Sequence, residues 1–214
     1  MRKFHRQLSI LVVILVFLSG IQVAFAKPTD YSGHWANKEI SEWVSLGIAQ
    51  TDSNGDFKPN QPIRRIDVAI LLNRLFNYQE KSSLKFSDIP NTSPYAADAA
   101  KAASAGNFTG DNGKFRPDDN ITRQEAAVVF ARALNLNTAD YKSLSKFKDA
   151  GRVASWSRAS VAAMAEKGYM SGKSGGMFAP ASDLTRAEAV KIVDNMVQGL
   201  KNKAGIYRPG NNSG

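Results

Sequence analysis

Apolar residues recur at three- and four-residue spacing in stretches that directly follow three short boxes of related sequence. The boxes are IRRID at 63–67, ITRQE at 121–125 and LTRAE at 184–188. After the second box the apolar positions are Ala126, Val129, Phe130, Ala133 and Leu134, and after the third they are Ala189, Val190, Val193, Met196 and Val197. This spacing places the apolar side chains on one face of an α-helix. The pattern therefore predicts a helix after each box.

A second apolar stripe precedes each box and ends at a glycine. Apolar residues lie four and seven positions before the glycine, and the three sets are Trp43 and Ile40 before Gly47, Ala102 and Ala99 before Gly106, and Met164 and Val161 before Gly168. A glycine fits the end of a helix, where the chain needs a left-handed residue. The segments between glycine and box (TDSNGD, TGDNGK and SGKSGG) are rich in turn residues and predict loops. Each unit reads as helix, loop, helix.

Further landmarks keep one order in all three units. An aromatic residue opens each unit, and a Phe-x-Pro tripeptide lies shortly before each box, at 57–59, 115–117 and 178–180. One helix pair of this size buries too little apolar surface to be stable alone. We therefore predict an all-α fold of three helix–loop–helix repeats, packed as a pseudo-threefold helical bundle. The expected boundaries are 1–26 for a signal peptide, 28–78, 84–136 and 145–200 for the three units, and 201–214 for a disordered tail, with polar linkers at 78–87 and 136–149.

The first 26 residues have the features of a signal peptide. A basic start is followed by an apolar core from Leu8 to Phe17 and by the cleavage pattern Ala24-Phe25-Ala26. The core is shorter than the roughly 20 residues that span a bilayer, which favours cleavage over a retained anchor. We expect an exported protein without a membrane span once the signal is removed.

The composition narrows the possible chemistry. The chain has no cysteine and two histidines, of which His5 lies in the predicted signal, so His34 stands alone. A Ser-His-Asp triad, a Cys-His pair and a His-rich zinc site are therefore disfavoured, and we expect no cofactor, no metal and no catalysis. The expected mature chain has a net charge of +6, because residues 1–26 carry three basic residues and no acidic ones. That charge fits an anionic extracellular polymer, and it equally fits ordinary solubility.

Two of the boxes have the pattern of a capping box. Thr122 and Thr185 are followed three residues later by Glu125 and Glu188. In this motif the threonine oxygen accepts a backbone N–H, and the glutamate reaches back to the threonine N–H. The two helices are therefore expected to start at the threonines. The first box lacks the motif, because Arg64 stands at the threonine position.

Each box also carries an arginine at the first helical position: Arg65, Arg123 and Arg186. The helix dipole favours acidic residues there, so an arginine repeated at this position in three units indicates a functional role for its side chain. A guanidinium beside the free N–H groups of a helix start fits a carboxylate or a phosphate. The plainer interpretation is a solvated first turn. In both cases we expect the side chains of Arg123 and Arg186 at the surface.

Together these landmarks resemble S-layer homology (SLH) modules. Their pattern is an Asp, His-Trp-Ala, a helix, Gly-Ile-x-x-Gly, an Asp-Gly-x-Phe-x-Pro loop and an Ile-Thr-Arg-Ala-Glu box. The first unit carries Asp30 and His34-Trp35-Ala36, and the second and third open with Phe86-Ser87-Asp88 and Phe147-Lys148-Asp149. The resemblance covers about 30 to 200.

The resemblance implies three grooves that bind secondary cell-wall polysaccharide, typically through the carboxylate of a ketal-linked pyruvate. The implied contacts are the box arginines (Arg65, Arg123, Arg186), aromatic residues that pack on sugar (Trp35, Tyr95, Trp156), aspartates that accept sugar hydroxyls (Asp30, Asp88, Asp149) and glycines that admit the ligand (Gly110, Gly172). The first unit departs from the pattern at Arg64, Ile66 and Asp67, and Thr51 stands where the other units have glycine. Whether its groove binds is left open.

The predicted function is non-covalent attachment of an exported protein to the cell wall, through an anionic and pyruvylated polysaccharide. The alternatives are an enzyme that acts on wall glycan and a structural subunit of an S-layer. Acidic pairs such as Asp118-Asp119 lie in loops that differ between units, which favours solvated loops over a glycosidase site. The export signal argues against nucleic acid as the partner, as does the lack of stacking aromatics in the loops. Protein partners stay unspecified.

Overall fold

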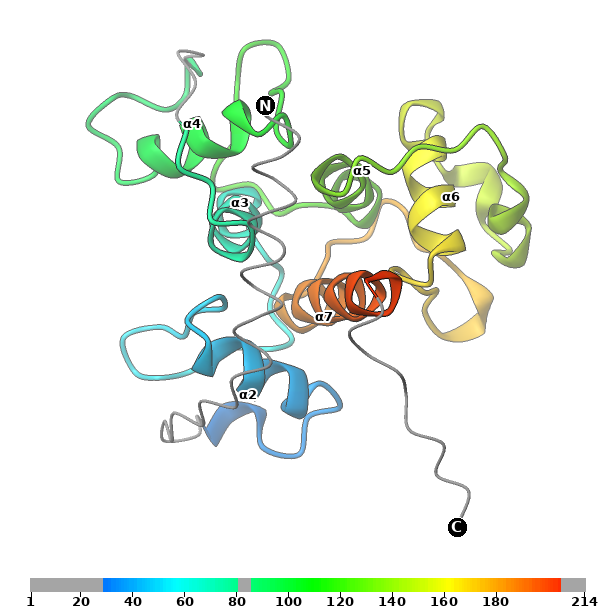
Figure 1. The fold of residues 1–214 in the computed structure, drawn as a ribbon, viewed down its shortest axis with the longest axis horizontal. Coiled ribbons are helices and arrows are strands. Elements are labelled where there is room, and N and C mark those ends of the chain that lie inside the picture. Colours follow the sequence, from blue (N-terminus) through cyan, green and yellow to red (C-terminus); the bar gives the residue numbers. More distant parts are fainter. Residues whose placement is uncertain (1–28, 81–85, 205–214) are drawn as a thin grey trace.

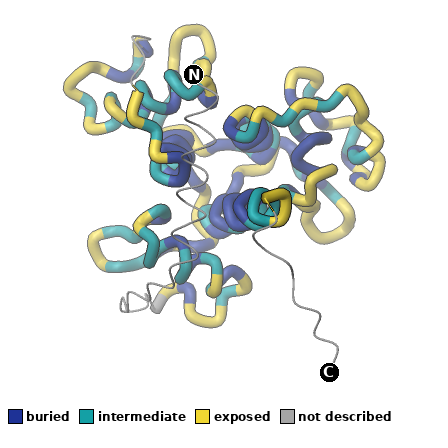
Figure 2. Tube along the Cα trace, in the orientation of Figure 1, coloured by how far each residue is buried: buried dark blue, intermediate teal, exposed yellow. Residues whose placement is uncertain are grey.

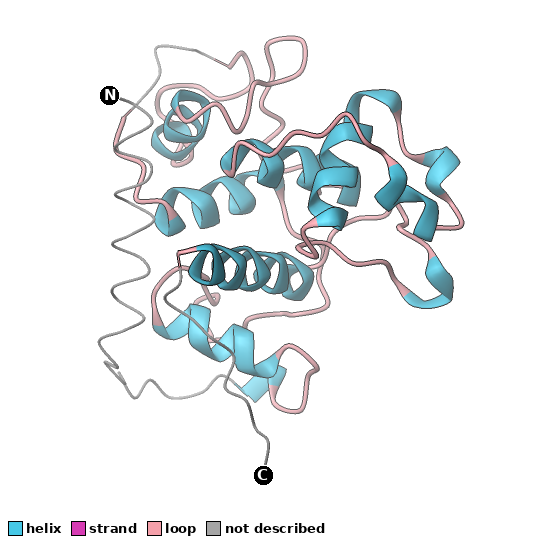
Figure 3. Ribbon diagram, turned by 45° about the vertical axis from the view of Figure 1, so that its right-hand side comes forward, coloured by secondary structure: helices cyan, strands magenta, loops and turns pink. Residues whose placement is uncertain are grey.

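The computed structural model describes residues 29–80 and 86–204, and its described part is built from helices and loops (Figure 3). The predicted signal segment, and the predicted tail beyond residue 204, lie outside the described residues. The α-helices are α2 (Asn37–Ser45), α3 (Arg65–Leu75), α4 (Ala96–Ser104), α5 (Arg123–Ala133), α6 (Arg158–Glu166) and α7 (Arg186–Lys203). Short 3-10 turns are η1 (Thr29–Tyr31), η2 (Lys142–Lys146), η3 (Ala150–Arg152), η4 (Ser155–Ser157) and η5 (Ser174–Gly176). The all-α prediction is confirmed.

The helix ends lie where the local signals put them. Gly47, Gly106 and Gly168 follow α2, α4 and α6 directly after the C-cap residue, with positive φ angles of 69°, 76° and 70°. Thr122 and Thr185 are the N-caps of α5 and α7, and both capping boxes are complete. Arg64 is the N-cap of α3 and makes no side-chain cap bond. The predicted starts and stops are confirmed.

The three helices that follow the boxes form the centre of the molecule. In Figure 1, α3, α5 and α7 lie around the middle of the view, and α2, α4 and α6 lie outside them. Each inner helix packs mainly against the outer helix of the next unit, so that α3 contacts α4, α5 contacts α6 and α7 contacts α2. The packed helix pairs therefore form between sequence units, and the third unit closes onto the first.

A closed cycle of backbone hydrogen bonds marks the pseudo-threefold axis. The first residue of each box donates its N–H to the first residue of another box: Ile63 to Leu184 (2.8 Å), Leu184 to Ile121 (2.9 Å) and Ile121 to Ile63 (3.1 Å). All three side chains are buried. Because each unit bonds to both others, the bundle closes only when all three units are present.

The core runs along the inner helices. Figure 2 shows α3, α5 and α7 mostly buried, with the exposed positions concentrated in the outer loops. The phenylalanine of each Phe-x-Pro tripeptide is buried with them, at 2% exposure or less for Phe57, Phe115 and Phe178. In the described part of the chain, no helix combines the length and apolarity that a membrane crossing requires.

The second predicted linker has more structure than its polar composition indicated. Residues 142–146 form η2, whose Leu144 is buried. The Ser143 hydroxyl donates to the Ala162 carbonyl (2.8 Å), and the Lys146 ammonium donates to the Ala165 carbonyl (2.9 Å). The segment therefore packs on α6, because one apolar side chain and two side-chain donors supply contacts that periodicity cannot reveal.

Removal of one cap tests these local assignments. Thr185 Oγ1 accepts the Glu188 N–H and Glu188 Oε2 accepts the Thr185 N–H, both at 3.2 Å. Thr185→Ala is expected to destabilise the fold by about 1 kcal/mol through the lost cap. The change Thr92→Ala, at an exposed threonine outside the helices, is the matched control. Equal urea midpoints for the two variants would contradict the role of the cap.

Candidate functional site

The Phe-x-Pro tripeptide of each unit is held from within the unit by an aspartate. In the third unit, Asp149 Oδ1 accepts the N–H of Phe178 (2.7 Å) and Oδ2 accepts that of Ala179 (2.8 Å), which has a positive φ of 57°. Asp30 binds the N–H groups of Phe57 and Lys58 in the same way, and Asp88 binds those of Phe115 and Arg116. Burial raises the pKa of Asp88, but backbone amide donors, including those of Phe115 and Arg116, together with the charge of Lys114 lower it below its ordinary value. These aspartates hold a left-handed turn.

The same tripeptide is held from outside by the box arginine of the preceding unit. Arg123 donates from Nε to the Phe178 carbonyl (2.8 Å) and from Nη2 to the Ser171 carbonyl (2.7 Å), and its Nη1 lies 3.4 Å from Glu188. Burial lowers the pKa of Arg123 and Glu188 partly offsets this, yet a guanidinium stays charged in proteins. Arg123 is 4% exposed and Arg65 8% exposed. The prediction of a surface side chain is wrong for Arg123.

The N–H groups at the start of each inner helix are also occupied. Arg65 donates its backbone N–H to Asp119, Arg123 to Ser182 and Arg186 to Gln61, each at 2.9 Å to the carbonyl oxygen. The next residue of each helix donates to the proline carbonyl of the same Phe-x-Pro tripeptide. The expected anion site on free helix N–H groups is therefore wrong, because the loop of the next unit already uses these donors.

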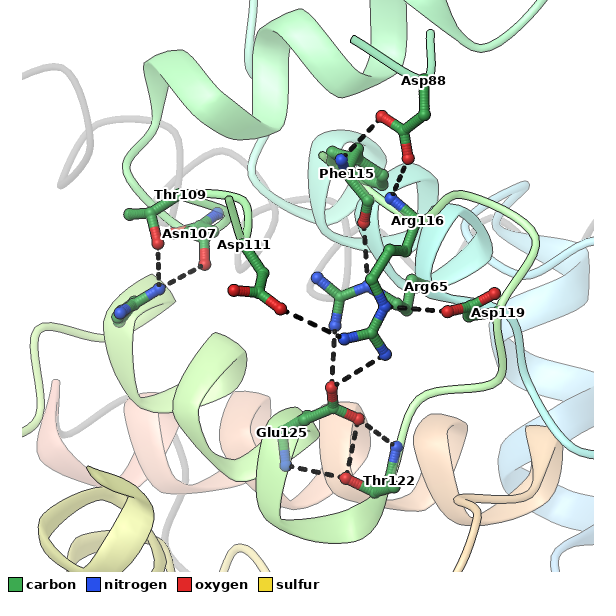
Figure 4. A network of polar contacts seen from close by, with 11 residues as sticks. Arg65, Asp88, Asn107, Thr109, Asp111, Phe115, Arg116, Asp119, Thr122 and Glu125 are labelled. Carbon is green, nitrogen blue, oxygen red and sulfur yellow. Dashed lines mark hydrogen bonds and ion pairs between the residues drawn. The ribbon is translucent and has the colours of Figure 1, made fainter. Parts of the chain in front are cut away.

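A groove lies along α5, between the second and third units, and we call it the second groove. It has a cavity volume of about 410 Å³, lined among others by Arg65, Arg116, Arg132, Asp111, Glu125 and Trp156. Figure 4 shows how Arg65 and Arg116 converge on one carboxylate: both bond Glu125 Oε1, at 3.4 and 3.3 Å, while Glu125 Oε2 accepts the Thr122 N–H. The groove thus places three guanidinium groups beside an exposed indole.

The opening aromatics differ in exposure. Trp35 and Trp156 are 62% and 59% exposed, whereas Tyr95 is half-buried. Trp156 is positioned across the second groove by Gln124 on α5, whose Oε1 accepts from the Ala154 N–H (3.1 Å) and the Ser157 hydroxyl (3.2 Å). The sequence analysis did not identify three residues of this site, because none of them recurs in all three units: Arg116, Arg132 and Gln124.

The glycines named from the resemblance are required by internal packing. A Cβ atom at Gly110 would lie 2.8 Å from the Phe86 ring, and one at Gly172 would lie 3.0 Å from the Phe147 ring. In the first unit Thr51 stands at the position of these glycines. Gly110 also lines the second groove. Its role toward a ligand stays a prediction.

Two further sites correspond to the second groove by the threefold repeat. The first groove, along α3, has a cavity of about 40 Å³ lined by residues that include Arg186, Asp67, Ile70 and Arg74. Arg186 is half-buried and donates to the carbonyls of Phe57 (2.7 Å) and Gln50 (2.6 Å), and among the described residues it has no ion-pair partner. The third site lies at α7, where Glu188 pairs with Arg123 and where α2, the helix after Trp35, packs.

The comparisons with known proteins agree with this threefold arrangement. The profile of the S-layer homology domain matches residues 29–69, 85–127 and 146–190. An amylopullulanase of Thermoanaerobacterium thermosulfurigenes is 32% identical over 174 residues, which are 79% of this chain and 9% of that protein. The exoglucanase XynX of Acetivibrio thermocellus is 29% identical over 86% of this chain and 17% of its own length. A cellulosome-anchoring protein of Acetivibrio thermocellus is 29% identical over 67% of this chain and 34% of its own length. The chain thus spans a minor part of each relative.

Proposed function

This chain belongs to the S-layer homology domain family, and from that premise we propose that it attaches to the cell wall at the cell surface by binding an anionic secondary cell-wall polysaccharide, without catalysis. The three matched segments cover every unit of the bundle. A relative named as a cellulosome-anchoring protein is consistent with attachment. The enzymes among the relatives extend far beyond the part that this chain matches, so their names carry no activity over to it.

The observation that carries the proposal is the second groove. An indole face offers a large apolar surface to the C–H face of a sugar ring, and Trp156 is exposed at the edge of the cavity. Guanidinium groups bind carboxylates through paired, charge-assisted hydrogen bonds. Arg65 uses Nε and Nη1 for the Phe115 carbonyl and Glu125, and its Nη2 has no hydrogen-bond partner among the described residues. The groove can thus hold a sugar beside an anionic substituent such as a pyruvyl ketal.

The other predicted site residues take part in different ways in this proposal. Arg186 in the first groove and Arg123 at the third site are the counterparts of Arg65, and Trp35 and Tyr95 are those of Trp156. The aspartates Asp30, Asp88 and Asp149 are positioning residues, because their oxygens hold the backbone on which the arginines rest. Gly110 has no side chain, which leaves room for the Phe86 ring against the loop that lines the second groove.

Sedimentation with purified cell walls tests the proposed function. The protein is expected to sediment with intact walls and to stay in solution with walls stripped of secondary polysaccharide. Removal of the pyruvyl groups is expected to release it as well, since the carboxylate is the proposed charge contact. Equal binding to stripped walls would contradict the proposal, and release of reducing sugar from the walls would favour an enzyme.

A single substitution tests the second groove. Trp156→Ala is expected to weaken binding of a short polysaccharide fragment at this groove roughly tenfold, which corresponds to about 1.4 kcal/mol. Tyr141→Ala is the control, because Tyr141 is 46% exposed and does not line the cavity. Calorimetric titration with a short fragment avoids the avidity that intact walls provide. Unchanged affinity in Trp156→Ala would exclude the indole as a sugar contact.

A further inference from the structure

A side chain that has no counterpart in the other units contacts Asp67, which lines the first groove. Arg64 stands at the N-cap position that Thr122 and Thr185 occupy elsewhere. Its Nε and Nη2 donate to the two oxygens of Asp67, at 3.0 and 2.9 Å. Its Nη1 donates to the Tyr95 hydroxyl and to Asp118, both at 3.0 Å. The guanidinium therefore joins α3 to the second unit.

Most of the donors of this guanidinium are used by protein partners. An arginine has five N–H donors, and the described contacts of Arg64 use four of them. Its Cζ also lies 5.5 Å from the centre of the Tyr95 ring, within the range of a cation–π contact. Both the ring and the hydroxyl of Tyr95 are thus engaged from inside the molecule.

In the second groove, Thr122 stands at the position that corresponds to Arg64. Among the described residues, the Thr122 side chain bonds only within its capping box. Trp156, the counterpart of Tyr95, is 59% exposed beside a cavity of about 410 Å³. The cavity beside Arg186 and Asp67 measures about 40 Å³. A wider depression nearby, lined by Val44, Gly47, Thr51 and Arg74 among others, does not include Arg186. Neither of these two cavities is lined by Tyr95, whereas the second groove is lined by both Arg65 and Trp156.

The departure at Asp67 belongs to the same change. Glu125 and Glu188 each pair with a box arginine, at 3.4 Å. Asp67 is one methylene shorter and is held by Arg64 through both of its oxygens, and among the described residues it has no ion pair with Arg186. With Arg64 at the N-cap position, α3 has no capping box. Among the described residues, the acidic box residue Asp67 pairs with Arg64 and not with the box arginine Arg186.

We propose that Arg64 is the specificity-determining residue of the first groove: its guanidinium lies against Tyr95, the aromatic residue on which a sugar would stack, so this groove does not take wall polysaccharide. The inference rests on the proposed function, since it states which of the sites performs it. Attachment is then carried by the sites that keep an exposed tryptophan and a complete capping box.

The test restores the sequence of the other units. Arg64→Thr with Asp67→Glu recreates the capping box and frees the Tyr95 ring. In calorimetric titrations with a short fragment of the wall polysaccharide, this variant is expected to bind one more fragment per chain than the wild type. The control is Arg152→Thr, at an exposed arginine of the third unit, which is expected to leave the number unchanged. An unchanged number in the double variant, with a melting temperature at or above that of the wild type, overturns the proposal.

A second measurement does not depend on polysaccharide binding. Arg64→Ala, Tyr95→Phe and the pair form a double-mutant cycle in urea unfolding. The two losses of stability are expected to be less than additive, because either change breaks the same hydrogen bond. Additive losses mean that the bridge does not exist in solution and overturn the proposal. A third outcome is that neither the wild type nor the restored variant binds the fragment while the cycle shows coupling. That outcome contradicts the proposed function and supports the contact between Arg64 and Tyr95.

Discussion

Arg123→Ala is expected to destabilise the bundle by about 3–5 kcal/mol, because two backbone carbonyls lose their donors and the ion pair with Glu188 is lost. Arg123 is 4% exposed and joins three groups of the third unit: the carbonyls of Phe178 and Ser171 and the carboxylate of Glu188. Its loss leaves the two carbonyls without these donors and opens space beside the Phe178 ring, which lies 5.0 Å from the guanidinium carbon. Glu188 keeps a second partner, Lys173, at 3.2 Å. The melting temperature should fall by on the order of 10 °C.

Two further variants make this result specific. Arg123→Lys keeps the charge but cannot reach two carbonyls and a carboxylate with one ammonium group, so a partial loss is expected. Arg152→Ala removes an exposed arginine from the third unit and is expected to cost little. A melting temperature of Arg123→Ala within about 2 °C of that of Arg152→Ala would show that the arginine does not hold the units together, since even 1 kcal/mol gives roughly 2–4 °C in a chain of this size. Binding lost in Arg123→Ala is informative about the ligand only where the fold is retained.

Local structure was predictable because its causes lie within a few residues. Helix starts at Thr122 and Thr185 follow from a threonine and a glutamate three positions apart, and the stops follow from glycines with a positive φ. The threefold repetition of the unit then predicted the overall arrangement of the helices. Three equal units that each bury too little surface must pack together, and a threefold bundle is the simplest closed arrangement.

The partners of the polar side chains were not predictable in the same way. The spacing of the box shows that an arginine opens each helix, but it does not show that the loop of the next unit lies over it. That contact depends on the crossed pairing of α3 with α4, α5 with α6 and α7 with α2. The sequence pattern of a recurring arginine is the same whether the side chain binds a ligand or a neighbouring backbone. Here Arg123 and Arg186 each donate two hydrogen bonds to backbone carbonyls.

The same crossed pairing explains why the landmarks recur as a set. The Phe-x-Pro tripeptide offers its N–H groups to the aspartate of its own unit and its carbonyls to the box of the preceding unit. A change at any of these positions therefore affects two units. Arg64 and Tyr95 differ from the pattern in side chains that make none of these contacts, so the tripeptide and the box keep their backbone hydrogen bonds in the first unit.

Asp149→Ala should be the second strongly destabilising change, with an expected loss of about 3 kcal/mol from two backbone N–H groups that lose their acceptors in a buried place. Asp149 is 5% exposed, and the N–H groups of Phe178 and Ala179 are directed at its two oxygens. Ala179 has a positive φ, a conformation that a residue with a side chain adopts at a cost and that the aspartate helps to hold.

The equivalent aspartate of the first unit provides the comparison. Asp30 makes the same pair of contacts, with Phe57 and Lys58, but it is exposed, so water can replace the carboxylate after Asp30→Ala. We expect a loss at least twofold smaller there. Asp149→Asn should fall between, because its amide supplies one acceptor oxygen where the carboxylate supplies two. Urea unfolding of the three variants measures the order. If Asp30→Ala proves as costly as Asp149→Ala, burial of the carboxylate does not set the energy of this contact, and the left-handed turn itself must depend on the aspartate in every unit.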